Sequence, residues 1–170
     1  MNITKPTQEA IQALITQCYI DNARIDRMKS VLLADLAYNE TAEIVHKYIA
    51  HYFSNKIGDD LSEKCLERYN ISVVFGGIPV MDKKYNTVKE VLDELLELVI
   101  DFQNQLSMCM KIASDNMDKQ IESDLIQFNV YYNNIVDQCI LLVDKIDLYK
   151  EDPSFDAHIK DHFFILKDVE

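Results

Sequence analysis

Carboxylates in two segments of the chain are the side chains best suited to chemistry. Asp60 and Glu63 are three positions apart, so they project from one face of a helix. Glu67 follows one turn later, and Asp26 lies in a separate polar interval nearer the N-terminus. Carboxylate oxygens suit hard cations such as iron(II), manganese, magnesium or calcium. These four residues are therefore the candidate metal ligands.

The same acidic residues have a second interpretation in which no metal takes part. Arg27, Lys29 and Lys56 are close to them in the sequence and offer salt bridges. Such acids can also face water, because an isolated buried charge is very costly. Metal binding and a solvated, ion-paired surface are both consistent with the pattern.

Glu43-Ile-Val-His46 is a second candidate for metal binding. Its Glu-x-x-His spacing is that of metal sites in helical bundles, although such a pair also arises often by chance. His51, His158 and His162 are expected at the surface or in subunit contacts, and the four cysteines in the core. No nucleophile–base–orienter arrangement, phosphate-binding loop or nucleotide fingerprint can be recognised.

Apolar residues spaced three and four positions apart predict four long helices, which must position these side chains. The two clearest stripes start at Val88 and Ile121. Thr87 is the expected N-cap of the first, with Glu90 completing a capping box. Pro153 ends the second, and a short amphipathic helix follows. We expect an all-α chain with breaks near residues 39, 76 to 87, 115 and 153.

The N-terminal half is expected to hold two helices, over residues 7–37 and about 41–75. Gly58 offers an alternative position for the break between them. Both helices are apolar at their ends and polar in the middle, around Asp26 in one and Asp60 in the other. If the two helices pack antiparallel, these polar intervals lie opposite each other near the middle of a bundle.

Composition narrows the classes of protein and partner. The 170 residues fit a single domain over residues 1–170. The net charge is −12 and the basic residues are dispersed, which disfavours nucleic acid as a partner. No apolar run is long enough to span a membrane, and no export signal is visible. Four scattered cysteines without a CxxC pair favour a reduced, cytoplasmic protein.

Several segments resemble the ferritin-like superfamily of ferritins, bacterioferritins and DNA-protecting mini-ferritins. IAHYF (49–53) is similar to the start of the second ferritin helix, and VVFGGIPV (73–80) to its glycine-rich end. TVKEVLDELLELV and MKIASDNMDKQIESDLIQF resemble the third helix and the turn into the fourth. The resemblance covers nearly the whole chain and implies an antiparallel four-helix bundle with a short C-terminal fifth helix. It also implies iron as the metal and a homo-oligomer, rather a large shell than a dimer.

The di-iron signature of that family is degenerate in this chain. The family has a glutamate on the first helix, Glu-x-x-His on the second, a glutamate on the third and a glutamate or glutamine on the fourth. The resemblance aligns these positions with Asp26, Asp60-Leu-Ser-Glu63, Val99, and Tyr132 or Asn133. Two helices then supply no ligand. An intrachain di-iron site is therefore disfavoured, and any enzymatic activity is at most of the ferroxidase type.

Mini-ferritins hold their metal between subunits, with ligands from the first two helices only. Glu63-Lys-Cys-Leu-Glu67-Arg68 resembles their Asp-x-x-x-Glu-Arg segment, although their histidines and tryptophan are not recognisable. The connection predicted over residues 78–86 would span ~30 Å if extended, the length of a bundle. A crossover connection is therefore permitted.

Two functions follow as alternatives. The first is a ferritin-like iron-binding, iron-storage or oxidative-stress protein, with a weakened metal site at Asp26, Asp60, Glu63 and Glu67. The second is a metal-free bundle of the same fold that acts as a structural or protein-interaction module. The polar intervals and the net acidity favour the first function. Val99 and Tyr132, which belong to the apolar stripes, favour the second.

Overall fold

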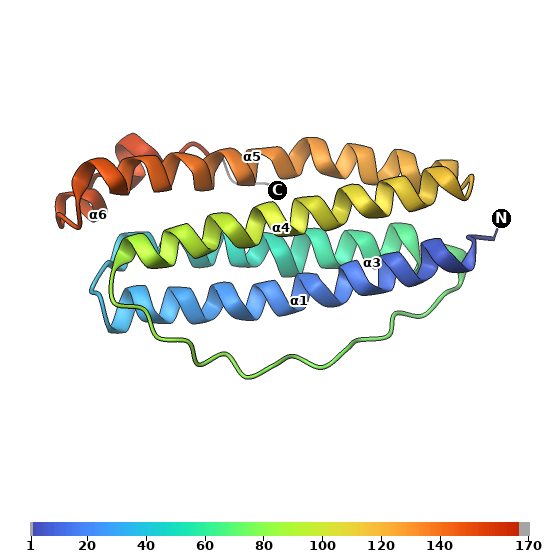
Figure 1. Ribbon diagram of the computed structural model, residues 1–170, viewed down its shortest axis with the longest axis horizontal. Helices are drawn as coiled ribbons and strands as arrows, with labels where there is room; N and C mark the ends of the chain where they lie inside the picture. Colours follow the sequence, from blue (N-terminus) through green and yellow to red (C-terminus); the bar gives the residue numbers. More distant parts are fainter. Residues whose placement is uncertain (1, 167–170) are drawn as a thin grey trace.

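The chain folds into an elongated helical bundle, shown as a computed structural model in Figure 1. The structure describes residues 2–166, without the side chains of residues 54 and 55. Within that range there is no β-strand, and the all-α prediction is confirmed. None of the helices described is apolar and long enough to cross a membrane.

The first two predicted helices pack against each other. α1 (Lys5–Ala34) is followed by a near-continuous column of α2 (Asn39–Ile44), η1 (Val45–Ala50), η2 (Tyr52–Gly58) and α3 (Asp59–Cys65), which contacts it along its length. The predicted break near residue 39 is confirmed, because Ala37 takes a left-handed conformation with φ 59° between the two helices. Gly58 lies inside the column with helical φ −59° and ψ −48°, so the alternative break is wrong. Two of the column's segments, η1 and η2, are π-helical.

The end of this column differs from the prediction. Helical structure was expected to residue 75, but α3 ends at Cys65 and a single 3₁₀ turn, η3 (Glu67–Tyr69), follows it. Asn70 then adopts the left-handed conformation, φ 62°, which commonly terminates a helix. The β-branched residues that follow also favour extended backbone over helix. The apolar run at 71–75 is therefore part of the connection.

Residues 70–87 form an extended strap instead of the predicted nine-residue link at 78–86. Figure 1 shows the strap in green, running the length of the bundle from the end of α3 to the start of α4 (Val88–Asp115). Gln12 on α1 holds one end, accepting from the N–H of Val74 at 3.0 Å and donating to the carbonyl of Ser72 at 3.1 Å. Arg27 donates to the carbonyl of Lys83 at 3.2 Å further along. The crossover topology is thus present.

The C-terminal half follows the predicted pattern. Thr87 caps α4 by accepting from the N–H of Glu90 at 3.1 Å, and the Glu90 carboxylate accepts from the N–H of Asn86 at 2.9 Å. α4 and α5 (Lys119–Tyr149) form the most extensively packed helix pair, joined by a short link. The short fifth helix is α6 (Ser154–His158), continued by η4 (Ile159–Phe163). These elements confirm the predicted four-helix bundle with a short C-terminal helix.

Candidate functional site

Aromatic rings fill the centre of the bundle, where its helices meet. Phe53 on η2, Phe102 on α4 and Tyr132 on α5 are fully buried. Their ring centroids are 5.1 Å apart for Phe53 and Phe102, 5.9 Å for Phe53 and Tyr132, and 5.4 Å for Phe102 and Tyr132. Aromatic pairs at these separations attract each other in addition to burying large apolar surfaces. This aromatic cluster therefore packs η2, α4 and α5 against one another in the core.

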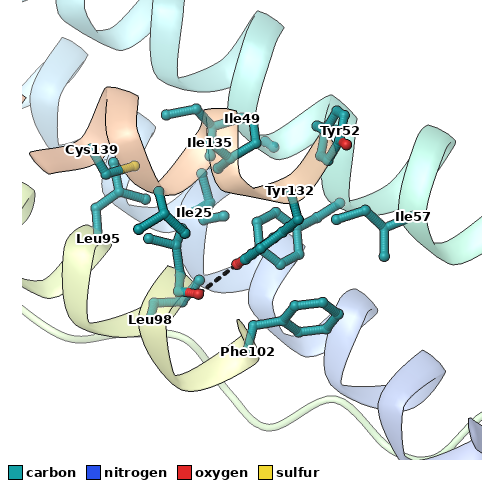
Figure 2. Close-up of a cluster of buried hydrophobic side chains, with 14 of the residues drawn as sticks. Ile25, Ile49, Tyr52, Ile57, Leu95, Leu98, Phe102, Tyr132, Ile135 and Cys139 are labelled. Carbon is teal, nitrogen blue, oxygen red and sulfur yellow. Dashed lines mark hydrogen bonds between the residues drawn. The ribbon is translucent and has the colours of Figure 1, made fainter. Parts of the chain in front are cut away.

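The Tyr132 hydroxyl has a single, well-placed partner. It donates a hydrogen bond of 2.6 Å to the backbone carbonyl of Val99 on α4, marked by the dashed line in Figure 2. Burial raises the pKa of Tyr132 well above its ordinary value, so the phenol stays protonated. The hydroxyl therefore acts as a satisfied donor and not as an anionic ligand.

The surroundings of the aromatic cluster are apolar. Figure 2 shows isoleucine, leucine and cysteine side chains around Tyr132, and these come from α1, η1, η2, α4 and α5. Burial raises the pKa of Cys139 and of Cys65 to about 12, and that of Cys109 to about 11. A thiol must lose its proton to bind a metal, so these cysteines are poor metal ligands. All four cysteines are buried, which confirms their predicted place in the core.

One carboxylate does lie inside the bundle, and sequence reasoning missed its importance. Asp21 is 2 % exposed and accepts a hydrogen bond of 2.8 Å from Gln17. Arg24 lies 3.6 Å away on the next turn of α1. Burial raises the pKa of Asp21 to about 6 despite both partners. The signal was its spacing, because Asp21 falls on the apolar stripe between Cys18 and Ile25.

The four predicted metal ligands are not brought together within the chain. Asp26 contacts His46 at 3.2 Å, whereas Asp60 pairs with Lys56 at 3.4 Å. His46 precedes Asp60 by 14 residues, so several turns of the column separate them. Glu63 and Glu67 are exposed near the end of the column. Across residues 2–166, no three His, Cys, Asp or Glu side chains gather closely enough to hold a metal ion.

The Glu43-Ile-Val-His46 pair is also divided between different partners. Glu43 forms an ion pair with Lys160 of η4 at 3.2 Å, while His46 contacts Asp26 on α1. The two side chains therefore do not form the Glu-x-x-His site that their spacing suggested.

Comparison with solved structures gives a match over nearly the whole chain. The structure resembles an open pore ferritin from the hyperthermophilic archaeon Archaeoglobus fulgidus, with a TM-score of 0.85 and 10 % identity. The match covers 97 % of this chain and 98 % of that one. The chain has the ferritin-like fold. A PmFTN variant soaked in iron matches with a TM-score of 0.80 and 15 % identity, over 91 % of this chain and 99 % of that one.

The TM-scores establish the ferritin-like fold, whereas sequence identities of 10 % and 15 % carry no function over to this chain. No protein-family model matches the chain, and no curated protein matches it in sequence. The resemblance inferred from sequence segments is confirmed at the level of the fold.

Within the ferritin-like fold, the bundle centre does not suit a di-iron site. The sequence resemblance aligns Val99 and Tyr132 with the family's third- and fourth-helix ligands, and in the structure both residues are fully buried and joined by a hydrogen bond. Iron is bound by carboxylate, imidazole or phenolate groups, and the aromatic cluster offers only the protonated hydroxyl of Tyr132. The residues present there do not fit the metal.

Proposed function

We propose that this chain is an oligomer-forming ferritin-like subunit, folded as one domain over residues 1–170, that binds iron(II) as cargo at surface carboxylates. The observation that carries the proposal is the ferritin-like fold along almost the entire chain. A net charge of −12 supports it, because a strongly acidic surface raises the local concentration of cations. The buried, protonated thiols suit a reducing cytoplasm.

The proposed iron ligands are the exposed carboxylates of Glu63 and Glu67 and the partly exposed carboxylate of Asp60. They follow one another on the last turns of the second helical column and lie outside the apolar centre. Asp26 is remote from them in the same chain, so it would join them only from a neighbouring subunit. With few ligands and no histidine among them, binding is expected to be weaker than at a complete di-iron centre.

An iron titration tests this assignment. The double variant Asp60→Ala with Glu63→Ala is expected to lose iron(II) binding while keeping its helical circular dichroism, because both side chains lie outside the core. Asp137→Ala with Asp144→Ala removes the same charge from exposed positions on α5 and serves as the matched control. Anaerobic iron(II) titration of the three proteins gives the stoichiometries. Equal iron uptake by the Asp60/Glu63 double variant and the parent would contradict the assignment.

Self-association is the second part of the proposal. α5 exposes Ile126, Val130, Tyr131 and Leu148, of which Leu148 is 71 % exposed. Exposed apolar residues gathered on one helix are suited to a contact between proteins. Symmetric homo-oligomers are the usual result when such surfaces are buried.

Analytical ultracentrifugation is expected to give one discrete species much heavier than the 19.8 kDa chain. Its mass should correspond to a shell of many subunits and not to a dimer. Burial of the apolar face of α5 between subunits is the physical reason. Tyr131→Glu should shift the distribution toward smaller species, because it places a charge in that face. A single species at the mass of one chain would rule self-association out.

A metal-free structural or interaction module is the second candidate function. It is favoured by the aromatic cluster, because Tyr132 occupies a position that the sequence resemblance aligns with a fourth-helix ligand. In that case the parent protein takes up no iron(II) yet sediments as a discrete oligomer. The iron titration and the sedimentation experiment together separate the two functions.

A further inference from the structure

Two histidines face each other at the surface of the second helical column. The Nε2 atoms of His46 and His51 are 3.3 Å apart. Their ring centroids are 4.7 Å apart and the rings are nearly perpendicular, at 78°. Two imidazoles that meet through the same nitrogen can share a proton or a metal ion between them.

The π-helical segment η1 is what brings this pair together. The backbone N–H of His51 donates to the carbonyl of His46, a bond between residues i and i+5. In an α-helix, residues five positions apart point about 140° away from each other. The wider π-helical turn places them on one face instead, and such turns occur frequently at functional sites.

Asp26 on α1 orients the first of the two rings. Its Oδ1 atom lies 3.2 Å from Nδ1 of His46. A carboxylate at this nitrogen favours the tautomer that has its proton on Nδ1, which leaves the Nε2 lone pair free. The same carboxylate–histidine arrangement supports metal-bound histidines in many proteins.

The separation of the two nitrogens matches a shared metal ion. Zinc–nitrogen bonds of ~2.0–2.1 Å at a tetrahedral angle place two ligand nitrogens ~3.3–3.4 Å apart. We propose that His46 and His51 bind one divalent transition-metal ion of the zinc class through their Nε2 atoms, with Asp26 holding His46 in place. Imidazole nitrogen suits zinc, copper and nickel, and water fills the remaining positions.

The site is open to solvent and does not depend on the proposed iron binding. His51 is exposed, and the side chains of His46 and Asp26 are 42 % and 46 % exposed. A metal ion can therefore enter without any opening of the bundle. The pair is remote from Asp60 along the column, so zinc and iron would bind separately.

Zinc titration of the full chain by calorimetry tests the site. The background carries His158→Ala and His162→Ala, because those rings form a second pair with centroids 5.4 Å apart. In this background one zinc ion per chain is expected. His46→Ala and His51→Ala should each weaken zinc binding by about 10-fold or more, because each removes one of two ligands. Asp26→Asn should weaken it by ~10–100-fold without abolishing it.

Copper supplies a readout that a purely structural role would not affect. The electron paramagnetic resonance spectrum of bound Cu(II) should show coupling to two nitrogens in the background protein and to one in His51→Ala. Circular dichroism confirms that the folds are equal. Unchanged zinc affinity in His51→Ala, or absence of zinc binding with the pair intact, would overturn the site and leave only two imidazoles sharing a proton. Iron stoichiometry should be equal in His51→Ala and its background, which separates this outcome from failure of the proposed iron sites.

Discussion

Alanine in place of Tyr132 is expected to lower the free energy of unfolding by about 3–5 kcal/mol, as for other buried aromatic residues. The side chain is fully buried and touches the rings of Phe53 and Phe102. Its removal leaves a cavity between three helices that the surrounding side chains can fill only in part. Chemical denaturation, at one protein concentration so that self-association contributes equally, gives the difference.

Tyr132→Phe is the matched control for this prediction. It keeps the ring and removes only the hydroxyl that donates to Val99. The expected loss is about 1 kcal/mol, typical of one hydrogen bond. If Tyr132→Ala cost no more than Tyr132→Phe, the aromatic cluster would not be the central support of the bundle. The pair of variants therefore separates packing from hydrogen bonding.

Asparagine in place of Asp21 is expected to stabilise the protein at neutral pH. Burial raises the pKa of Asp21 from 3.8 to about 6 in the folded state. Between these values the folded chain binds more protons than the unfolded chain, so its stability falls as the pH rises through 6. The difference between the two pKa values corresponds to roughly 3 kcal/mol at most. Asp21→Asn should recover part of this loss above pH 6.

Denaturation midpoints from pH 4 to 8 check this behaviour. The parent is expected to lose stability over that range relative to Asp21→Asn, and the two proteins should converge near pH 4. Asp26→Asn serves as the control, because Asp26 is 46 % exposed and its removal leaves the pH dependence due to Asp21 in place. A constant difference between parent and Asp21→Asn at every pH would refute the assignment.

The sequence predicts the C-terminal half better than the N-terminal half, for physical reasons. The stripes from Val88 and Ile121 are continuous, and Thr87 supplies a local start signal for α4 that tertiary contacts do not override. The sequence predicts helix at 71–75 because periodicity alone does not separate an apolar helix end from an extended segment packed on a bundle. What ends the helix is the left-handed conformation of Asn70.

The candidate sites were harder to predict because they depend on the geometry of the second column. Spacing rules assume α-helical turns, whereas η1 is π-helical and joins His46 to His51 instead of to Glu43. The partner of Asp26 follows from how α1 packs on that column, which no local pattern specifies. The filled bundle centre was anticipated from Val99 and Tyr132, since both fall on apolar stripes.

The strap at residues 70–87 has a consequence for how the chain reaches this structure. On either side of it lie two helical hairpins, α1 with the column and α4 with α5, each closed by a short local turn. Contacts within a hairpin are close in sequence and form early, whereas docking of the hairpins needs contacts between distant segments. The strap keeps the two hairpins at a high effective concentration. Hydrogen bonds from Gln12 and Arg27 fasten it to α1. Folding should therefore consist of two fast local steps and one slower docking step, and a chain cut within the strap would retain both hairpins.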